Sequence, residues 1–351
     1  MGFDRIVGQE RAKNILRLAL RRGRVPNSLL FAGPEGVGKR MTAFTLARAL
    51  NCLRGGDDPC EECQNCRAVL AGMEDENKGF PDVKEILPGG KEILPWVEKN
   101  NDEEAGSDVI KIRQVRYVKY HAYRRPMAGR KRAFIFNEAE KMSEPSFSAF
   151  LKVLEEPPPL THLMMLTAYP ERIPQTIASR CSLMQFGPLP REDIERHLIS
   201  LGREPERARV LAYLSSGSLE TALEADWKEV NQVRREAWEI LRALLRREGG
   251  AEFLEDYSFL RRGKGTTERL ARLWEAMAAF LRDLLLARES EDLRLLMNPD
   301  YEAALRAEAS SLSPGEIQSA LDRVESSLKG LRTSRNLSLL VSAFYSDIID
   351  R

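Results

Sequence analysis

The N-terminal half of the chain alternates short apolar runs with stretches in which apolar residues recur at helical spacing. Residues 27–31 (NSLLF) and 133–136 (AFIF) are apolar enough to form buried strands, whereas residues 41–51 (MTAFTLARALN) carry the spacing of a helix. Such alternation is typical of a parallel sheet covered by helices. The pattern predicts an α/β domain over residues 1–187, interrupted by a polar, irregular stretch at residues 73–107.

The C-terminal half carries no strand pattern. A small helical module is expected over residues 188–225, beginning with a helix at 191–198, and longer helices are expected over residues 226–351. Apolar stripes with charged opposite faces predict a helical bundle or an oligomerisation collar from helices at 227–247, 268–288, 317–331 and 336–349. The predicted fold class is therefore α/β followed by all-α.

The composition is typical of a soluble protein with packed domains. Of the 351 residues, 43% are hydrophobic and 30% are charged, which is enough for two or three cores. No apolar run reaches the about 18 residues of a membrane span, and the N-terminus lacks a signal-peptide core, so we expect a cytoplasmic protein without a membrane. The net charge of +1 gives no whole-molecule attraction to nucleic acid, although basic clusters at 124–125 and 130–132 leave a local DNA contact open.

A glycine-rich loop pattern, GPEGVGKR at residues 33–40, lies between the first predicted strand and its helix. Gly33, Gly36 and Gly38 would let the backbone N–H groups surround a phosphate at the helix N-terminus, and Lys39 would reach the terminal phosphates. The pattern predicts descent from a site for ATP or ADP. The alternative is an ordinary glycine-rich turn that binds nothing.

Two positions argue against magnesium in this site. A working loop follows its lysine with Ser or Thr, whose hydroxyl ligates Mg²⁺, whereas Arg40 is a cation without an acceptor atom. The strand at 133–136 ends in Asn137, where such folds place an aspartate that supports the metal, and only Glu138 remains to polarise a water. We therefore expect no magnesium, and whether nucleotide still binds is left open.

Four cysteines follow the loop with the spacing C-x7-C-x2-C-x2-C. The insert around them is poor in apolar residues, so it requires a crosslink to fold, and two-residue gaps direct successive thiolates at one ion. This spacing predicts a structural zinc site made by Cys52, Cys60, Cys63 and Cys66. An iron–sulfur cluster, a redox pair and disulfides are the competing uses of these thiols.

The order of these motifs resembles the bacterial DNA polymerase III clamp-loader subunits of the AAA+ superfamily. The resemblance rests on Val7–Gln9, the glycine-rich loop, the cysteine quartet, the acidic strand end, the segment 154–157 (LEEP) and the segment 179–181 (SRC). It implies an AAA+ P-loop domain with a zinc-binding insert, a lid module and a C-terminal collar. It also implies that Arg180 is an arginine finger acting in trans on a neighbour's ATP site, and that Thr167 is the polar sensor residue.

Within that family, the resemblance favours the non-hydrolysing delta-prime subunits over the gamma/tau motors, because Arg40, Asn137 and Glu220 stand where a motor needs a hydroxyl, an aspartate and an arginine. The implied partners are the gamma/tau motor subunits and the delta subunit, with the sliding clamp and primer–template DNA reached through the assembly. Three alternatives remain: a gamma/tau-like motor, another self-sufficient P-loop ATPase or phosphotransferase, and a zinc-dependent nucleic-acid binder with a relic nucleotide fold.

Overall fold

A computed structural model describes residues 2–75, 79–90, 108–246, 266–290, 295–331 and 337–349. The chain divides into two compact units, Met1–Asp193 with Gly217–Glu220 and Ile194–Ser216 with Thr221–Arg351. The finer division into domains at 1–187, 188–225 and 226–351 stays a prediction. Each unit is described by itself.

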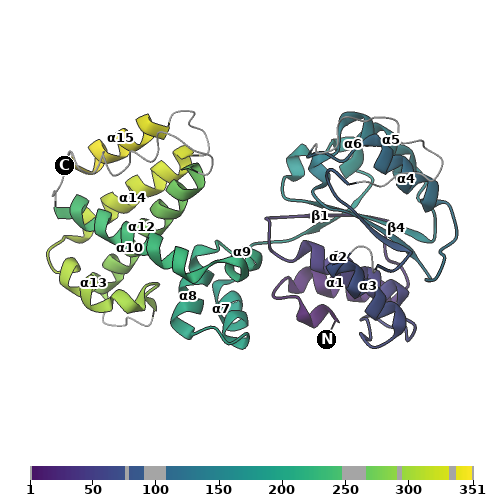
Figure 1. Ribbon diagram of the computed structural model, residues 1–351, viewed down its shortest axis with the longest axis horizontal. Coiled ribbons are helices and arrows are strands. Elements are labelled where there is room, and N and C mark those ends of the chain that lie inside the picture. The colour runs from purple at the N-terminus through teal and green to yellow at the C-terminus, as the bar shows by residue number, and fades with distance from the viewer. Residues whose placement is uncertain are drawn as a thin grey trace. The chain divides into compact units, whose positions relative to one another are not determined.

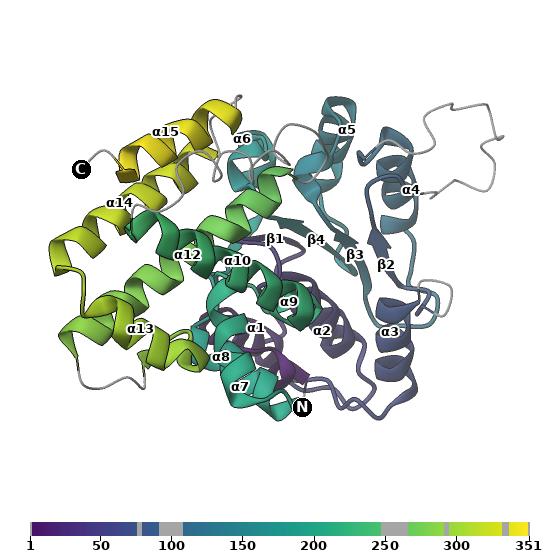
Figure 2. The same cartoon turned by 60° about the vertical axis from the view of Figure 1, so that its left-hand side comes forward.

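Within the described part of the first unit, five strands form a parallel sheet in the order β2-β3-β4-β1-β5 (Figure 2). The strands are β1 (Ser28–Ala32), β2 (Val83–Ile86), β3 (Arg132–Phe136), β4 (Thr161–Thr167) and β5 (Ser182–Gln185). The helices that precede and connect them are α1 (Glu10–Arg21), α2 (Lys39–Asn51), α3 (Gln64–Glu74), α4 (Ile112–Ala122), α5 (Glu144–Glu155) and α6 (Gln175–Ala178).

Helices cover both faces of this sheet. Helices α1, α2 and α3 lie on one face, and α4, α5 and α6 lie on the other (Figure 1). Because successive side chains of a strand point to opposite faces, Ala133 and Ile135 of β3 pack with the α1 and α2 side, whereas Phe134 and Phe136 pack with the α4 and α5 side. Burial on both faces explains why the strand reads as one continuous apolar run.

The second unit is helical wherever the structure describes it. Its core joins Trp238, Trp274, Phe280 and Phe344. The helices from residue 191 onward are α7 (Arg191–Ser200), α8 (Pro205–Leu214), α9 (Leu219–Glu224), α10 (Trp227–Arg246), α12 (Thr266–Glu289), α13 (Glu302–Ala309), α14 (Pro314–Leu331) and α15 (Leu337–Ile349). Among the described helices, none is long and apolar enough to cross a membrane.

The predicted fold class, α/β followed by all-α, is confirmed, and it is the architecture that the AAA+ resemblance implies. One expectation is wrong: residues 83–86, inside the stretch predicted to be irregular, form β2. Among the described strands, β2 pairs with β3 alone, and of its residues only Ile86 is buried, so it lacks the apolar run that marks the central strands. Residues 76–78 and 91–107 of that stretch lie outside the described residues.

We expect a buried histidine on β4 to make the stability of the first unit depend on pH. His162 is 3% exposed, its Nδ1 lies 3.0 Å from the Pro26 carbonyl oxygen, and its Nε2 has no hydrogen-bond partner in the part of the chain that the structure describes. Burial lowers the pKa of His162 to about 4. Because its ordinary pKa of about 6.5 applies to the unfolded chain, protonation favours unfolding as the pH falls from about 6.5 to about 4.

We expect His162 to lower the free energy of unfolding by about 2 kcal/mol when the pH falls from 7 to 5. The measurement is urea unfolding of the native chain and of His162→Gln at both pH values. The variant is expected to lose less stability over this interval, whatever its stability at pH 7. His197→Gln, at a half-buried position on α7, is the control, and equal losses in the native chain and in His162→Gln would contradict the assignment.

Candidate functional site

The glycine-rich loop runs from the carboxyl end of β1 to the N-terminus of α2. Gly38 is the N-cap of α2 with φ 99°, and Lys39 is the first helical residue. The N–H of Gly33 donates to the Thr167 carbonyl at the end of β4, 3.1 Å away. A Cβ added to Gly33 would lie 2.1 Å from the Phe186 carbonyl oxygen, so the close approach of two strand ends requires glycine. The predicted context of the motif, between strand and helix, is confirmed.

The segment Gly217–Glu220 packs directly on this loop. The Gly36 carbonyl oxygen accepts hydrogen bonds from the N–H groups of Leu219, at 3.0 Å, and Glu220, at 3.3 Å. A Cβ added to Gly36 would lie 2.0 Å from the Ser218 hydroxyl oxygen. The loop is therefore in direct contact with Glu220, the position at which the family resemblance places the arginine of a motor subunit.

The Lys39 side chain folds back onto its own loop. Its Nζ donates to the carbonyl oxygens of Gly33, at 2.6 Å, and Pro34, at 2.5 Å. Burial lowers the pKa of the Lys39 ammonium, while the carboxylates of Glu35, Glu140 and Glu220 act in the opposite sense. An ammonium has three donors and these contacts use two of them, so one donor remains for a terminal phosphate.

Arg40 lies in a contact that the sequence did not reveal. Its guanidinium makes two hydrogen bonds of 2.7 Å with the Glu85 carboxylate on β2, donates to the Met73 carbonyl at 2.9 Å, and lies 5.0 Å from the centre of the Phe44 ring. The planar guanidinium places two N–H donors opposite the two carboxylate oxygens, and a hydroxyl could not make this pair of hydrogen bonds. Glu85 is 45 residues away and comes near only because β2 joins the sheet beside β3.

The residues at the carboxyl ends of β3 and β4 make local hydrogen bonds and ion pairs. The Asn137 side-chain oxygen accepts from the N–H of Glu138, 3.2 Å away, and Glu138 adopts a left-handed conformation with φ 50° and pairs with Lys141. The Thr167 hydroxyl is buried and accepts from the N–H of Tyr169 at 3.0 Å. Because the strands are parallel, the carboxyl ends of β3 and β4 lie on the same side of the sheet as the glycine-rich loop, which follows the carboxyl end of β1. The roles of Asn137, Glu138 and Thr167 with a ligand stay predictions.

Arg180 follows α6 at the surface of the first unit. Its guanidinium donates to the Thr176 carbonyl, at 2.8 Å, and to the Glu155 carboxylate, at 3.1 Å, and its side chain is 37% exposed. Glu155 belongs to the LEEP segment, so the structure joins two motifs that are separate in the sequence. A half-exposed arginine held by one surface ion pair can be transferred to another anion at little cost, because such pairs contribute only about 0–1 kcal/mol.

The four predicted cysteines come together. Their Sγ atoms all lie within 4.8 Å of one another, and Cys52 and Cys66 are buried. Four thiolates around one zinc ion with bonds of about 2.3 Å would be separated by roughly 3.8 Å, so this set fits a closed tetrahedral site after a small contraction. Backbone N–H groups of Cys60 and Cys63 point at the preceding sulfurs at 3.4 Å, which would stabilise thiolates. The donor set is compatible with structural zinc.

Acidic residues of this cysteine knuckle, residues 52–66, hold the N-terminal segment in place. The N–H groups of Gly2 and Phe3 donate to the carboxylates of Glu61 and Asp58, each at 2.9 Å. Arg17 of α1 pairs with the same Asp58 at 2.8 Å. The knuckle therefore organises neighbouring backbone as well as its own short loop.

Known proteins are similar to this chain in sequence. The sequence model of one protein family, described as "DNA polymerase III, delta subunit", matches residues 8–190, just over half of the chain. The delta-prime subunit of DNA polymerase III from Bacillus subtilis (strain 168) is 29% identical over 245 residues, which are 70% of this chain and 68% of that protein. The tau subunit of DNA polymerase III from Escherichia coli (strain K12) is 32% identical over 228 residues, 63% of this chain, which thus spans about a third (32%) of that longer relative.

Among solved structures, a DNA polymerase III, gamma subunit-related protein from Thermotoga maritima is similar over nearly its whole length. It aligns over 98% of this chain and 99% of its own, at 17% identity and a TM-score of 0.39. No functional conclusion follows from a superposition of that quality. The family match, by contrast, covers the loop, the cysteine knuckle and the SRC segment together, and the chain accordingly belongs to the DNA polymerase III clamp-loader family.

Proposed function

We propose that this chain is a non-hydrolysing clamp-loader subunit of the replicative DNA polymerase III holoenzyme. In this proposal it supplies Arg180 to the ATP site of a neighbouring motor subunit while the sliding clamp is loaded onto DNA. Its direct partners would be gamma/tau motor subunits and the delta subunit, with the clamp and primer–template DNA reached through the assembly, in the cytoplasm.

The observation that carries the proposal is the Arg40–Glu85 contact. At the position where a motor places its magnesium-binding hydroxyl, this chain has a guanidinium whose two hydrogen bonds direct it toward β2. The second metal-supporting position is the neutral Asn137, whose oxygen accepts from Glu138. Phosphoryl transfer in these folds depends on a metal ion held between the phosphates. A chain that lacks both of these metal-binding side chains is therefore not expected to hydrolyse ATP.

Arg180 supports the second half of the proposal. The arginine is exposed at the surface, where a neighbouring chain could approach it, and its planar, permanently charged guanidinium suits a γ-phosphoryl group. The glycine-rich loop would then serve as scaffold. Any nucleotide it retained would meet a Lys39 that already donates to Gly33 and Pro34, and it would lack a magnesium site.

The cysteine knuckle is part of the same proposal. Cys52, Cys60, Cys63 and Cys66 would hold one zinc ion in a closed site, which would supply folding free energy and no catalysis. The insert's acidic contacts to Gly2 and Phe3 would extend that stabilisation to the chain's first residues.

Measurement of ATP turnover by the purified chain tests the proposal. We expect no turnover above background with or without Mg²⁺, because Arg40 and Asn137 cannot ligate the ion. After a motor subunit and the remaining loader components are added, ATP turnover by the assembly should appear, and it should respond to primer–template DNA and the clamp. Magnesium-dependent hydrolysis by the chain alone would instead support the gamma/tau-like motor, which the similarity to the tau subunit keeps as the second candidate.

A further inference from the structure

The N-terminal segment, residues 2–9, contacts both the cysteine knuckle and the glycine-rich loop. It begins on the knuckle, where the N–H groups of Gly2 and Phe3 donate to the carboxylates of Glu61 and Asp58. Its other end lies on the loop. Both ends of this short segment are fixed by hydrogen bonds, so the segment links two sites that are separate in the sequence.

The segment packs tightly on the knuckle at Gly2. This residue has a left-handed conformation with φ 63°, and a Cβ added to it would lie 1.8 Å from a carboxylate oxygen of Asp58. The next residue, Phe3, is buried, and the guanidinium of Arg17 on α1 lies 5.6 Å from the centre of its ring while pairing with Asp58. Asp58 therefore holds Phe3 both directly and through Arg17.

The turn between two of the predicted zinc ligands fixes the position of Glu61. This residue lies between Cys60 and Cys63 in a left-handed conformation with φ 62°, which is uncommon for glutamate and persists where the surrounding structure imposes it. Its carboxylate also pairs with the buried guanidinium of Arg48 at 3.4 Å. If the turn relaxed without its metal, the Glu61 carboxylate would leave the Gly2 N–H.

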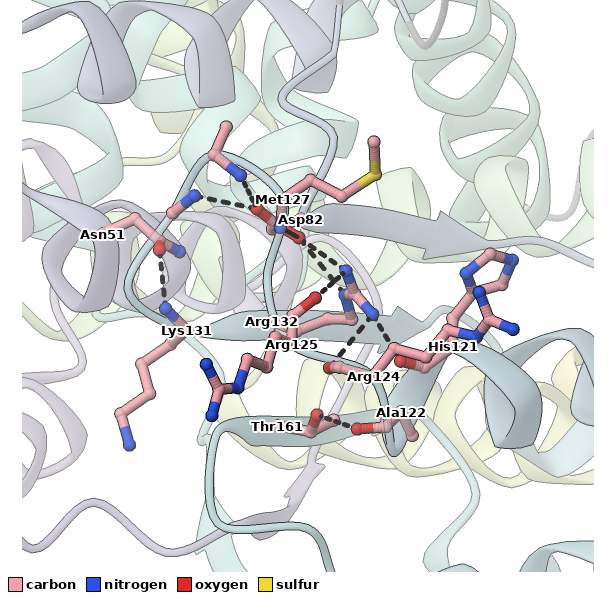
Figure 3. Close-up of polar contacts among 12 residues, drawn as sticks. Asn51, Asp82, His121, Ala122, Arg124, Arg125, Met127, Lys131, Arg132 and Thr161 are labelled. Atoms are coloured by element: carbon pink, nitrogen blue, oxygen red, sulfur yellow. Dashed lines mark hydrogen bonds and ion pairs between the residues drawn. The ribbon is translucent and has the colours of Figure 1, made fainter.

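One end of the knuckle is anchored without help from a metal. Asn51 ends α2 and precedes Cys52, and its side-chain oxygen accepts from the N–H of Lys131 at 3.0 Å, directly before β3 (Figure 3). Cys52 would therefore stay attached to the sheet when the metal leaves. The freedom gained would fall on the rest of the knuckle, which carries both carboxylates that hold the N-terminal segment.

Gln9 holds the glycine-rich loop and the segment after β5 together. Its side-chain amide donates to the carbonyl oxygens of Val37, at 3.3 Å, and Gly187, at 2.7 Å, and its side-chain oxygen accepts from the Gly187 N–H at 3.3 Å. Ile6 is buried against the last glycine of the loop, where a Cβ added to Gly38 would lie 3.5 Å from the Ile6 side chain. The N-terminal segment therefore supports the turn that begins α2.

One face of α1 joins these contacts. Gln9, the N-cap of the helix, is followed at intervals of four residues by Lys13 and Arg17, so the three side chains lie along one side. The buried Lys13 donates to the Ile6 carbonyl oxygen at 2.9 Å, and Arg17 pairs with Asp58 at 2.8 Å. Hydrogen bonds and a rigid helix therefore form a continuous connection from the knuckle to the loop.

We propose that Asp58 and Glu61 couple the metal occupancy of the cysteine knuckle to the conformation of the glycine-rich loop, through the N-terminal segment. In the metal-bound knuckle both carboxylates hold the segment, and Gln9 holds the turn that begins α2; in the metal-free knuckle the segment is released and that turn opens. Because coupling between two sites is reciprocal, a phosphate-bearing ligand that orders the loop would also strengthen metal binding. The proposal rests on the zinc site of the proposed function and is independent of the role of Arg180.

Hydrogen exchange of the full chain, compared by mass spectrometry in the zinc-loaded and chelated states, tests the coupling. The reporter is the start of α2, where the Thr42 N–H donates to the Gly38 carbonyl at 2.9 Å. We expect chelation to speed exchange there at least about tenfold, because the contacts that hold this turn are lost. Exchange in the central strand β4 should stay unchanged. Faster exchange in β4 as well would indicate general unfolding and would overturn the proposal.

Two double variants assign the effect to the carboxylates. Asp58→Ala/Glu61→Ala, prepared with zinc bound, keeps the four cysteines and should speed exchange at the start of α2 as chelation does. The matched control is Asp57→Ala/Glu62→Ala, which makes the same change in the same knuckle at carboxylates paired with exposed arginines, and it should exchange like the native chain. Elemental analysis of each variant measures the zinc that it retains.

Gln9→Ala separates the two ends of the connection. Chelation should still speed exchange in residues 2–6 of this variant, while the start of α2 should exchange fast with or without zinc. The proposal fails if α2 ignores chelation in the native chain, if the control matches Asp58→Ala/Glu61→Ala, or if Gln9→Ala responds like the native chain.

If Asp58→Ala/Glu61→Ala loses its zinc, the comparison of the native chain with Gln9→Ala decides. A native chain without zinc would overturn this proposal together with the zinc assignment. A zinc-bound chain whose loop does not respond to chelation would overturn this proposal alone.

Discussion

Replacing Arg180 with alanine is expected to reduce DNA-stimulated ATP turnover at the adjacent motor site by about 10³-fold or more, because fingers supplied in trans contribute about 10³–10⁵ in rate in related NTPases. The effect should fall on the chemical step and leave the fold intact, since the Arg180 side chain hydrogen-bonds only Thr176 and Glu155 among the described residues. Single-turnover hydrolysis in the reconstituted loader is the measurement. A loader with several motor sites will retain the turnover of the sites that Arg180 does not reach.

Two variants make this result specific. Arg172→Ala removes another arginine of the same unit, one that lies over the Tyr169 ring, and should leave turnover unchanged. Arg180→Lys keeps a positive charge but loses the planar fork, so it should recover only part of the activity. Unchanged hydrolysis and clamp loading with Arg180→Ala would reject the finger assignment.

Removing zinc is expected to unfold the cysteine knuckle and to lower the stability of the first unit by several kcal/mol, because structural zinc contributes about 10–16 kcal/mol in isolated zinc-finger peptides. The insert has little apolar surface with which to refold unaided, and the N–H groups of Gly2 and Phe3 lose their carboxylate partners when it opens. Hydrogen exchange after chelation should therefore increase in residues 2–21 and 52–74, together with a lower melting temperature. Elemental analysis should give one zinc per chain.

Cys63→Ser, at the half-buried N-cap of α3, should reproduce the effect of chelation. Cys181→Ser, the control, removes the cysteine that lies outside the cluster and should retain the metal. Visible absorbance of an iron–sulfur cluster, or unchanged exchange after metal removal, would contradict the zinc assignment.

The sequence by itself determined the elements whose signals are local. The strand at β1, the glycine-rich loop and α2 follow one another within 24 residues, from Ser28 to Asn51, and the structure has them in that order. The cysteines lie close in sequence, so their spacing was enough to predict a cluster. The long helices of the second unit were predicted from their apolar periodicity, because a helix that buries one face repeats apolar residues at helical spacing.

Other features depended on the tertiary structure. The partner of Arg40 could not be found, because Glu85 lies 45 residues away on an edge strand whose polar residues give no strand signal. The same holds for the hydrogen bond between Asp82 and Met127, which are 45 residues apart, and for the one between Asn51 and Arg130, which are 79 residues apart. These contacts arise from the order of strands in the sheet. Periodicity and spacing depend on residues that are near one another along the chain. The hydrogen-bond partners of a buried carboxylate or guanidinium are instead distant residues, and only the folded sheet brings them close to it.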